Sequence, residues 1–452
     1  MNYDIVIVGL SITSSWGNGH ATTYRSLARG LAGRGHRVLF LEHDTPWYAE
    51  NRDTPQPPGT TTRLYSSFEE LIERFEAVIR DARLVILGSY VQDGARVGDW
   101  VTSVARGRTA FYDIDTPVTL AQLEHGETSH ITPALIRRFN AYFSFTGGPT
   151  LRYLESHYGA PMARVLYCSV DTDRYRPLRE PKMWDLGYLG TYSDDRQPAL
   201  EMLLLEPARQ WRRGAFAVAG ALYPDDIVWP RNVYRETHIS PREHAAFYAR
   251  QWLTLNITRE EMKKRGFSPS VRLFEAGACG AAIVSDWWVG LSELFVPGRE
   301  VLISESADQT LRYLRDHPKS RLAEIGLAAR RRILAEHTAE HRAIQLENYL
   351  KEIDANALPY TSRRNGRRGP VADGLDSWMP SESNGHGASG KAGGETVAVS
   401  DRRDLYQPIG AGRGNGSSDR GAKKSATPAV ESPGRVAPGR VGGRNDIGTR
   451  SS

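Results

Sequence analysis

The stretch that decides the fold is GFSPSVRLFEAGACGAAIVSDWWVGLSELF, residues 266–295. Ser268 is a preferred helix N-cap, Pro269 suits the first helical position, and Gly280 follows the apolar run where a helix end favours positive φ. These residues predict a short helix over about 269–279. AAIVSD follows it as an apolar run without helical periodicity, which is typical of a parallel strand covered on both faces.

Glu275 lies in the middle of this predicted helix, in a stretch that is otherwise almost free of charge. A carboxylate in apolar surroundings needs a partner, and a pair of ligand hydroxyls supplies one. The stretch therefore predicts a nucleotide-binding corner in which Glu275 meets the ligand.

Length and composition indicate two domains. A chain of 452 residues is too long for one core, and with 40% hydrophobic residues and 10 Trp it has ample material for burial. No run of about 18 apolar residues occurs, and MNYDIVIVGL begins a strand without a basic leader, so we expect a cytoplasmic protein. Cys168 and Cys279 lie in apolar surroundings, which favours reduced core cysteines over a disulfide or a metal site.

The net charge of +5 comes from the C-terminal tail. Residues 361–452 carry 15 Lys and Arg against 9 Asp and Glu, which leaves about −1 for the rest of the chain. The same segment holds 18 of the 43 glycines and has almost no periodic apolar pattern, so we expect a disordered basic tail over 358–452. Its RRNGRR and GRVAPGRVGGR patches fit contact with anionic surfaces, and a solvated tail is the alternative interpretation.

Strand-like and helix-like runs alternate twice along the chain. The first set of strands is expected at 3–9, 36–43, 84–89, 109–115, 141–146 and 163–169, and the second at 184–192, 214–222, 252–258, 281–286 and 301–304. Such alternation predicts mostly parallel, doubly wound sheets whose ligands sit beyond the carboxyl ends of the strands. The domains expected are 1–175, a linker over 176–183, a second domain over 184–338, and a final helix over 339–357.

A glycine-rich loop, SSWGNGH, joins the first strand to the first helix. Gly17 and Gly19 let backbone amides approach a ligand, and the helix N-terminus after them favours negative charge. A dinucleotide site is the rival interpretation, because Glu42 and Asp44 end the second strand where a ribose-binding acid would lie. The spacing argues against it, since that fingerprint puts its first glycine directly after the strand and its third on the helix, where this chain has Thr22.

These two regions together resemble the GT-B class of glycosyltransferases, and within it most closely the spore-coat CgeB/YkvP-type glycosyltransferase-like proteins. The resemblance implies that Glu275 binds the ribose hydroxyls of a nucleotide-sugar donor. It also implies that His20, at the start of the first helix, acts in the chemistry on the acceptor side, although a helix cap or surface histidine is the other interpretation. In the resembled class the last helix often returns to the first domain.

One departure from the resembled pattern concerns the donor sugar. Many retaining members carry a second Glu eight residues before the ribose-binding acid, and here Phe267 occupies that position. Any role of that first acid is therefore not transferred to this chain.

Transfer from a nucleotide sugar requires a group that holds the charge of the leaving diphosphate. Glycines and basic or polar residues near strand ends of the second domain predict a metal-free anion pocket, formed by Gly187, Gly190, Arg196, Asn256, Thr258, Arg259, Arg272 and the amides of Ser268 to Arg272 with Ser270 among them. Two Asp-x-Asp triplets, Asp113 to Asp115 and Asp171 to Asp173, are the alternative, but so short a pattern arises easily by chance. We therefore expect no metal and no cofactor, with the nucleotide sugar as a substrate.

The sequence predicts a glycosyltransferase whose acceptor is a glycan, a lipid-linked sugar or a small molecule. An inverting enzyme needs a general base, for which His20 has a suitable ordinary pKa, and a retaining one needs none from this loop. Two alternatives remain: a nucleotide-sugar epimerase, and a catalytically inactive nucleotide- or glycan-binding protein of a coat or envelope. Trp287 and Trp288 fit either stacking on a ligand or one core and one rim position.

Overall fold

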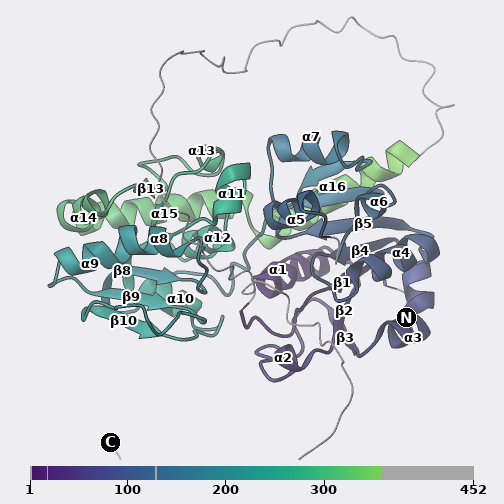
Figure 1. Ribbon diagram of the computed structural model, residues 1–452, viewed down its shortest axis with the longest axis horizontal. Coiled ribbons are helices and arrows are strands. Elements are labelled where there is room, and N and C mark those ends of the chain that lie inside the picture. The colour runs from purple at the N-terminus through teal and green to yellow at the C-terminus, as the bar shows by residue number, and fades with distance from the viewer. Residues whose placement is uncertain (1–2, 18, 128–129, 358–452) are drawn as a thin grey trace, which may run out of the picture. The chain divides into compact units, whose positions relative to one another are not determined.

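The computed structural model describes residues 3–17, 19–127 and 130–357 (Figure 1). The expectation of a disordered tail over 358–452 lies outside these residues. No helix in the described part of the chain is long and apolar enough to span a bilayer.

Strands fall into two groups along the chain. The first comprises β1 (Ile5–Gly9), β2 (Val38–His43), β3 (Thr61–Tyr65), β4 (Leu84–Gly88), β5 (Arg108–Asp113), β6 (Ala141–Ser144) and β7 (Ala163–Val165). The second comprises β8 (Trp184–Leu189), β9 (Phe216–Ala219), β10 (Val233–Glu236), β11 (Gln251–Asn256), β12 (Ala282–Ser285) and β13 (Leu302–Ile303).

Helices alternate with these strands. Those of the first group are α1 (His20–Gly33), α2 (Pro46–Ala49), α3 (Phe68–Asp81), α4 (Gly94–Val104), α5 (Thr116–Glu124), α6 (Pro133–Ile136) and α7 (Pro149–Ser156). Those of the second are α8 (Gln197–Leu200), the π-helical turn η1 (Glu201–Leu205), α9 (Glu206–Gln210), α10 (His244–Ala249), α11 (Glu260–Arg265), α12 (Val271–Ala278), α13 (Leu291–Leu294), α14 (Ala307–Asp316), α15 (Lys319–Glu336) and α16 (Ala339–Ala357).

Each group of strands forms one parallel sheet. The first sheet has the order β3-β2-β1-β4-β5-β6-β7 and the second the order β10-β9-β8-β11-β12-β13. In both, the chain runs outward from a central strand to one edge and then returns to build the other, which is the doubly wound arrangement. The two Rossmann-like sheets predicted from the alternating pattern are therefore confirmed.

The first sheet is buried on both faces because its central strand is apolar throughout. Ile5 and Ile7 of β1 belong to one apolar cluster and Val6 and Val8 to another, as the two-residue period of a strand requires. Residues of α1 and α16 belong to the first cluster, and residues of α3 and α4 to the second. The same first cluster continues into α12 and α15, so one apolar core connects the two sheets.

Helix α16 packs against α1, and Figure 1 shows the two lying side by side. Gly30 permits this approach, because a Cβ at that position would lie 2.2 Å from the carbonyl oxygen of Ala339. Arg34 of α1 also pairs with Glu347 of α16 at 2.8 Å. The last helix thus contacts the first-sheet half of the chain.

The sequence pattern missed β3 and β10, which form one edge of each sheet. β3 (TTRLY) and β10 (VYRE) mix polar and apolar residues and are partly exposed, because an edge strand has a neighbour on one side only. Neither run shows the continuous apolar pattern by which the central strands were found.

The predicted start of the helix over about 269–279 was wrong by two residues. Helix α12 begins at Val271, and its N-cap is Ser270, whose hydroxyl accepts a hydrogen bond from the amide of Arg272. Ser268 is used elsewhere, as described below. Gly280 has φ +70 directly after the helix end, as its position in the sequence predicted.

The two cysteines are free and buried, as expected. The adjacent tryptophans divide their roles, because Trp288 is 2% exposed and belongs to the core whereas Trp287 is 43% exposed. The interpretation as one core and one rim position is therefore confirmed for this pair.

Candidate functional site

The glycine-rich loop leads into α1 and leaves the helix N-terminus without a side-chain cap. Gly19 is the N-cap, His20 is the first helical residue, and the first turn contains no acid. The dipole of α1 places partial positive charge at this helix end. Gly17 has φ +66, and a Cβ on Gly19 would lie 3.7 Å from Val271 at the start of α12. The two predicted ligand-binding helix ends thus lie next to each other.

Glu42 holds this loop in place. Its carboxylate is fully buried and accepts hydrogen bonds from the amides of Ile12 and Thr13, at 2.7 and 2.9 Å, and from the hydroxyls of Ser11 and Thr13. An acid saturated in this way has no oxygen left for a ribose, which agrees with the argument against a dinucleotide site. No sequence pattern indicated this supporting role, because only the tertiary fold brings Glu42 of β2 next to the loop.

His20 is enclosed by aromatic rings. It is 9% exposed, its ring centroid lies 5.8 Å from that of Tyr90, and its Nδ1 has no hydrogen-bond partner among the described residues. Burial, together with the nearby His130, lowers the pKa of His20 to about 4. The sequence argument relied on the ordinary value, so this is a correction: the imidazole is neutral near pH 7 because it is desolvated.

A second histidine, His130, lies in the same aromatic cluster. Its ring stacks at 4.6 Å on Tyr90, and burial lowers its pKa to about 4. Its Nε2 lies 3.3 Å from the hydroxyl of Thr119, which in turn donates to Asp113 at 3.0 Å. No sequence motif singled out His130, because it becomes a neighbour of His20 only through packing.

The Asp-x-Asp triplets have other partners. Asp113 is fully buried and is hydrogen-bonded by Thr119 and Tyr142, and burial raises its pKa to about 6. Asp171 and Asp173 pair with Arg29. Among the described residues no group of three or more His, Cys, Asp or Glu side chains is arranged to hold a metal ion.

Arg259 connects the two sheets electrostatically. Its guanidinium lies 3.3 Å from Asp195 and 3.9 Å from Asp115, which follows β5 of the first sheet. Arg196 is the N-cap of α8, where it donates to Ser193 and to the carbonyl of Thr191. The charges of both predicted arginines act on Asp115, whose pKa burial nevertheless raises.

Arg272 is a buried member of the predicted basic residues, and its charge has no carboxylate partner among the described residues. It is 6% exposed, its Nε donates to the carbonyl of Leu189, its Nη1 donates to Asn256 at 3.0 Å, and the guanidinium lies 4.8 Å above the ring of Tyr188. Within the described part of the chain it makes no ion pair. A buried cation of this kind attracts an anionic ligand.

Gly190 allows this guanidinium to lie close to the backbone. A Cβ at Gly190 would lie 2.7 Å from Nη2 of Arg272 and 2.5 Å from the hydroxyl of Tyr188. Gly187 has a different reason to be glycine, because a Cβ there would lie 2.3 Å from the side chain of Gln251. Of the two predicted glycines, only Gly190 therefore lies against the guanidinium of Arg272.

Asn256 supports Arg272 from the interior. It is fully buried, accepts from Arg272, and donates to Ser285 at 2.9 Å. Thr258 is likewise buried and bonds to Asp286. Asn256 thus holds the guanidinium of Arg272, and contact of Asn256 and Thr258 with a ligand stays a prediction.

Glu275 is 4% exposed and lies in a cluster of hydroxyl and imidazole groups. The hydroxyl of Tyr248 donates to Oε2 at 3.2 Å, and Nδ1 of His244 lies 3.7 Å from the same oxygen. Burial beside this carboxylate raises the pKa of Tyr175 and of Tyr248. No arginine pairs with Glu275 in the described residues, so the buried acid keeps capacity to accept from a ligand.

A cavity of about 380 Å³ lies beside this cluster. It is bordered by α1, by the segment 171–178 and by α10, and none of the predicted site residues lines it. Tyr175 does line it and also contacts His244 at 3.3 Å. The side chains of Tyr175 and His244 thus separate the carboxylate of Glu275 from this cavity.

Ser268 and Phe267 join the two halves of the chain. The hydroxyl of Ser268 is fully buried and lies 2.8 Å from that of Thr146, which follows β6. The carbonyl of Phe267 accepts from the amide of Gly147 at 2.9 Å, and Phe267 itself has φ +48. Ser268 therefore contributes to the junction and Ser270 caps α12, and contact of either serine with a ligand stays a prediction.

Comparison with known proteins agrees with this architecture. Residues 196–348, about a third of the chain, match the model of a family described as glycosyl transferase-like. No protein in the curated collection matches the chain.

Solved structures resemble the chain over most of its described length. A sucrose-phosphate synthase from Thermosynechococcus elongatus is 15% identical with a TM-score of 0.57, over 78% of this chain and 100% of the other. HepE from Anabaena, in complex with UDP and glucose, is 13% identical with a TM-score of 0.58 over the same shares. An α-glucosyltransferase in complex with UDP and a 13-mer DNA is 10% identical with a TM-score of 0.54, over 77% of this chain and 99% of the other. These likenesses show the fold, and the GT-B architecture is thereby confirmed.

Proposed function

We propose that this chain is a glycosyltransferase of the CgeB/YkvP type, which transfers a sugar from a nucleotide-sugar donor without a metal. The observation that carries the proposal is the buried guanidinium of Arg272, which lies against Gly190 and has no carboxylate partner in the described residues. A donor diphosphate supplies the missing negative charge, and the amides at the start of α12 add to its binding.

In this proposal Glu275 binds the ribose. A carboxylate offers four lone-pair positions, and the neighbouring Tyr248 and His244 both approach Oε2. Ribose hydroxyls therefore find acceptor capacity there, on the helix whose N-terminus lies by the diphosphate. The match of residues 196–348 to a glycosyl transferase-like family, and the UDP bound by HepE, support a nucleotide ligand in this half of the chain.

His20 is proposed as the base that takes the acceptor proton. Its neutral imidazole has an unpartnered Nδ1, so the ring can accept a proton at the stage when the acceptor hydroxyl attacks the sugar. A base at this place serves transfer with inversion, and the stereochemistry of the product reports on it. Burial of the growing imidazolium opposes the step, and the developing negative charge of the attacking oxygen nearby favours it.

One observation favours a second candidate function, nucleotide or glycan binding without turnover in a coat or envelope. Phe267 stands where the resembled class often has an acid, and its left-handed backbone and contact with Gly147 lock an apolar ring at the domain junction. Release of free sugar or nucleotide from a bound nucleotide sugar separates the two candidates, because the binding protein produces neither.

The test of the donor site is a thermal-shift screen with UDP, GDP, ADP and dTDP and their sugars. Glu275→Gln keeps the shape of the side chain and removes its charge, so the best nucleotide should bind about tenfold more weakly or worse. Glu300→Gln is the matched control, because Glu300 is also a buried acid of this half but pairs with Arg332 at 3.1 Å. It should lower the melting temperature and leave the nucleotide shift intact. Equal nucleotide shifts for wild type and Glu275→Gln would contradict the proposal for Glu275.

A further inference from the structure

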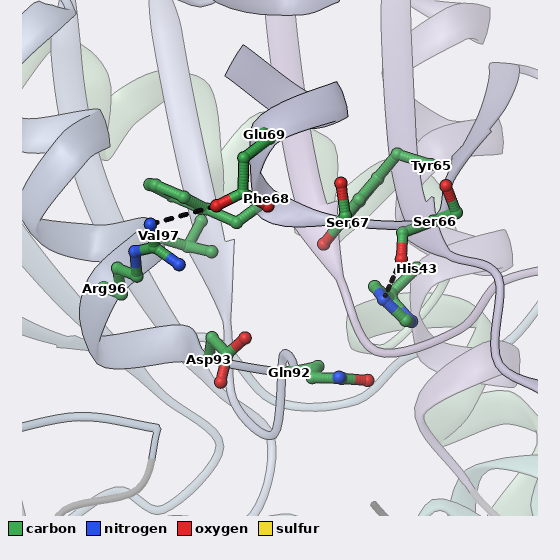
Figure 2. Close-up of a pocket in the computed structure, with 10 residues that line it drawn as sticks. All are labelled: His43, Tyr65, Ser66, Ser67, Phe68, Glu69, Gln92, Asp93, Arg96 and Val97. Carbon is green, nitrogen blue, oxygen red and sulfur yellow. Dashed lines mark hydrogen bonds and ion pairs between the residues drawn. The ribbon is translucent and has the colours of Figure 1, made fainter.

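A second cavity lies at the carboxyl edge of the first sheet, on the side away from α1. Its volume is about 150 Å³, and its walls come from the ends of β2 and β3 and the starts of α3 and α4. We call it the Tyr65 pocket and define it by His43, Tyr65, Ser67, Phe68, Asp93 and Arg96 (Figure 2). A cavity of this volume accommodates one six-membered ring, since an engineered cavity of roughly 150 Å³ takes up benzene. Ligands of parallel sheets bind at this edge.

The walls of the Tyr65 pocket hold polar atoms that lack partners. The hydroxyl of Tyr65 and Nδ1 of His43 are both buried and make no hydrogen bond within the described residues. Figure 2 shows the two side chains on one side of the space, with Asp93 and Arg96 on the other. Each orphaned group destabilises the free protein, because a buried polar atom without a partner has lost its hydrogen bonds to water. A ligand hydroxyl that reaches these atoms supplies the missing hydrogen bonds.

The charge of the pocket favours an uncharged ligand. Arg96 is neutralised by Glu69 at 3.1 Å and also covers the ring of Phe68 at 4.0 Å. Asp93 is exposed, and its carboxylate makes no hydrogen bond or ion pair with any described residue. Its free carboxylate repels anions and accepts hydrogen bonds from hydroxyl groups.

One loop connects this pocket to His20. Residues 89–93, between β4 and α4, contain two non-glycine residues with left-handed backbone, Tyr90 at φ +60 and Asp93 at φ +53. Such conformations are strained and persist at functional sites. Tyr90 packs on His20 and Asp93 lines the pocket, and the backbone between them spans at most roughly 11 Å.

We propose that the Tyr65 pocket is an acceptor subsite that binds one uncharged sugar ring of a glycan whose neighbouring unit presents its reacting hydroxyl to His20. This inference rests on the proposed glycosyl transfer and adds the acceptor class, a neutral saccharide of at least two units. Tyr65 and His43 bind hydroxyls of the held ring, and Asp93 accepts a further hydroxyl. The strained loop keeps the ring and the reacting hydroxyl at a fixed spacing.

The test is isothermal titration of the full chain, with UDP or the best nucleotide present. The probes are methyl glycosides of glucose, galactose and N-acetylglucosamine, their β-1,4-linked disaccharides, and glucuronic acid and glucose 6-phosphate as anionic counterparts. The best neutral disaccharide should bind, and the anionic probes should not. Tyr65→Phe and Asp93→Asn should each weaken binding of the best neutral disaccharide about tenfold or more.

Free-protein stability separates binding from a structural role. Tyr65→Phe should keep or raise the melting temperature, because it removes a buried hydroxyl without a partner. Asp93→Asn retains a residue that tolerates left-handed backbone, so the loop should persist. Asp308→Asn, an exposed aspartate in the first turn of α14 without an ion pair in the described residues, is the matched control and should bind the disaccharide like wild type.

Three results would overturn the inference. They are a failure of every neutral probe to bind wild type, equal binding by wild type and both pocket variants, and preferential binding of the anionic probes. If wild type still binds nucleotide in these cases, the proposed function stands and only the acceptor subsite is wrong. If wild type binds no nucleotide, the proposed function fails and the inference fails with it.

Discussion

Replacement of Arg272 by glutamine tests the proposed diphosphate site most directly. The wild-type guanidinium is buried, and its Nε and Nη1 are already used by Leu189 and Asn256, so Nη2 beside Gly190 remains for the ligand. Two unit charges 4 Å apart attract by about 4 kcal/mol at an effective dielectric constant of 20. Loss of one member of a buried charge pair costs about 2–5 kcal/mol in binding. We therefore expect Arg272→Gln to weaken binding of the best nucleoside diphosphate by roughly 100-fold, about 3 kcal/mol.

Titration calorimetry with the diphosphate and with the corresponding nucleoside checks this expectation. The nucleoside carries no phosphate, so its affinity should change by less than about threefold, whereas the diphosphate should lose most of its advantage. Stability of the free protein should change by about 1 kcal/mol at most, because relief of the buried charge offsets the lost hydrogen bonds.

Arg342→Gln is the matched control for this experiment. Arg342 is also buried, at 5% exposure, and its donors are used by the carbonyls of Tyr167 and Glu336 and by His337 at 2.7 Å. Its replacement should lower the stability of the protein and leave its affinity for the nucleoside and for the diphosphate unchanged. If Arg272→Gln binds the diphosphate within threefold of wild type, or loses nucleoside and diphosphate affinity equally, the assignment of Arg272 to the diphosphate is refuted.

Three further predictions follow from the same geometry. Gly190→Ala should reduce diphosphate affinity at least about tenfold, because its Cβ would lie 2.7 Å from Nη2 of Arg272, and calorimetry measures the loss. Glu42→Ala should lower the free energy of unfolding by about 3 kcal/mol or more in urea titrations, since two amides and two hydroxyls lose their acceptor; a loss below 1 kcal/mol would contradict this. Burial lowers the pKa of His20 and of His130 to about 4 from 6.5, so the unfolded chain binds more protons between these values and stability should fall on acidification from pH 6.5 to 4. Asp113, whose pKa is raised to about 6, works in the opposite sense below that pH, and His20→Gln should flatten the fall seen in thermal melts at stepped pH.

The pH dependence of catalysis offers an independent check on His20. A base with a pKa of about 4 in the free enzyme remains neutral well below pH 6.5, so the acidic limb of kcat/KM should lie nearer pH 4. A limb centred near 6.5 would mean that the reacting base is a solvated group and not this buried imidazole.

Local sequence determined the central strands, and it determined those helix ends that a residue such as glycine marks. β1 is apolar at every position, so it is buried on both faces wherever it lies, and the run after Gly280 is a strand for the same reason. Gly280 itself required positive φ. These features depend on residues within a few positions of each other, which is why periodicity and turn chemistry were enough.

Edge strands and cap positions needed the tertiary structure. β3 and β10 are half-exposed and carry polar residues, so their pairing depends on the neighbour that the fold supplies. Ser268 looked like a cap because serine is favoured there, yet Thr146 takes its hydroxyl from across the junction. A contact between residues so distant in sequence has no local signature.

The candidate site divides in the same way. Sequence alone marked Arg272 by its place at a helix start, Glu275 as an acid in a stretch almost free of charge, and His20 through the resemblance to GT-B enzymes. Only packing decided that Arg259 is paired with acids while Arg272 is not, and that Asn256 stands behind the guanidinium. Burial likewise set the pKa of His20, and it brought His130 and Glu42 to the site. Desolvation and charge compensation are sums over neighbours from the whole chain, and a linear sequence does not contain those distances.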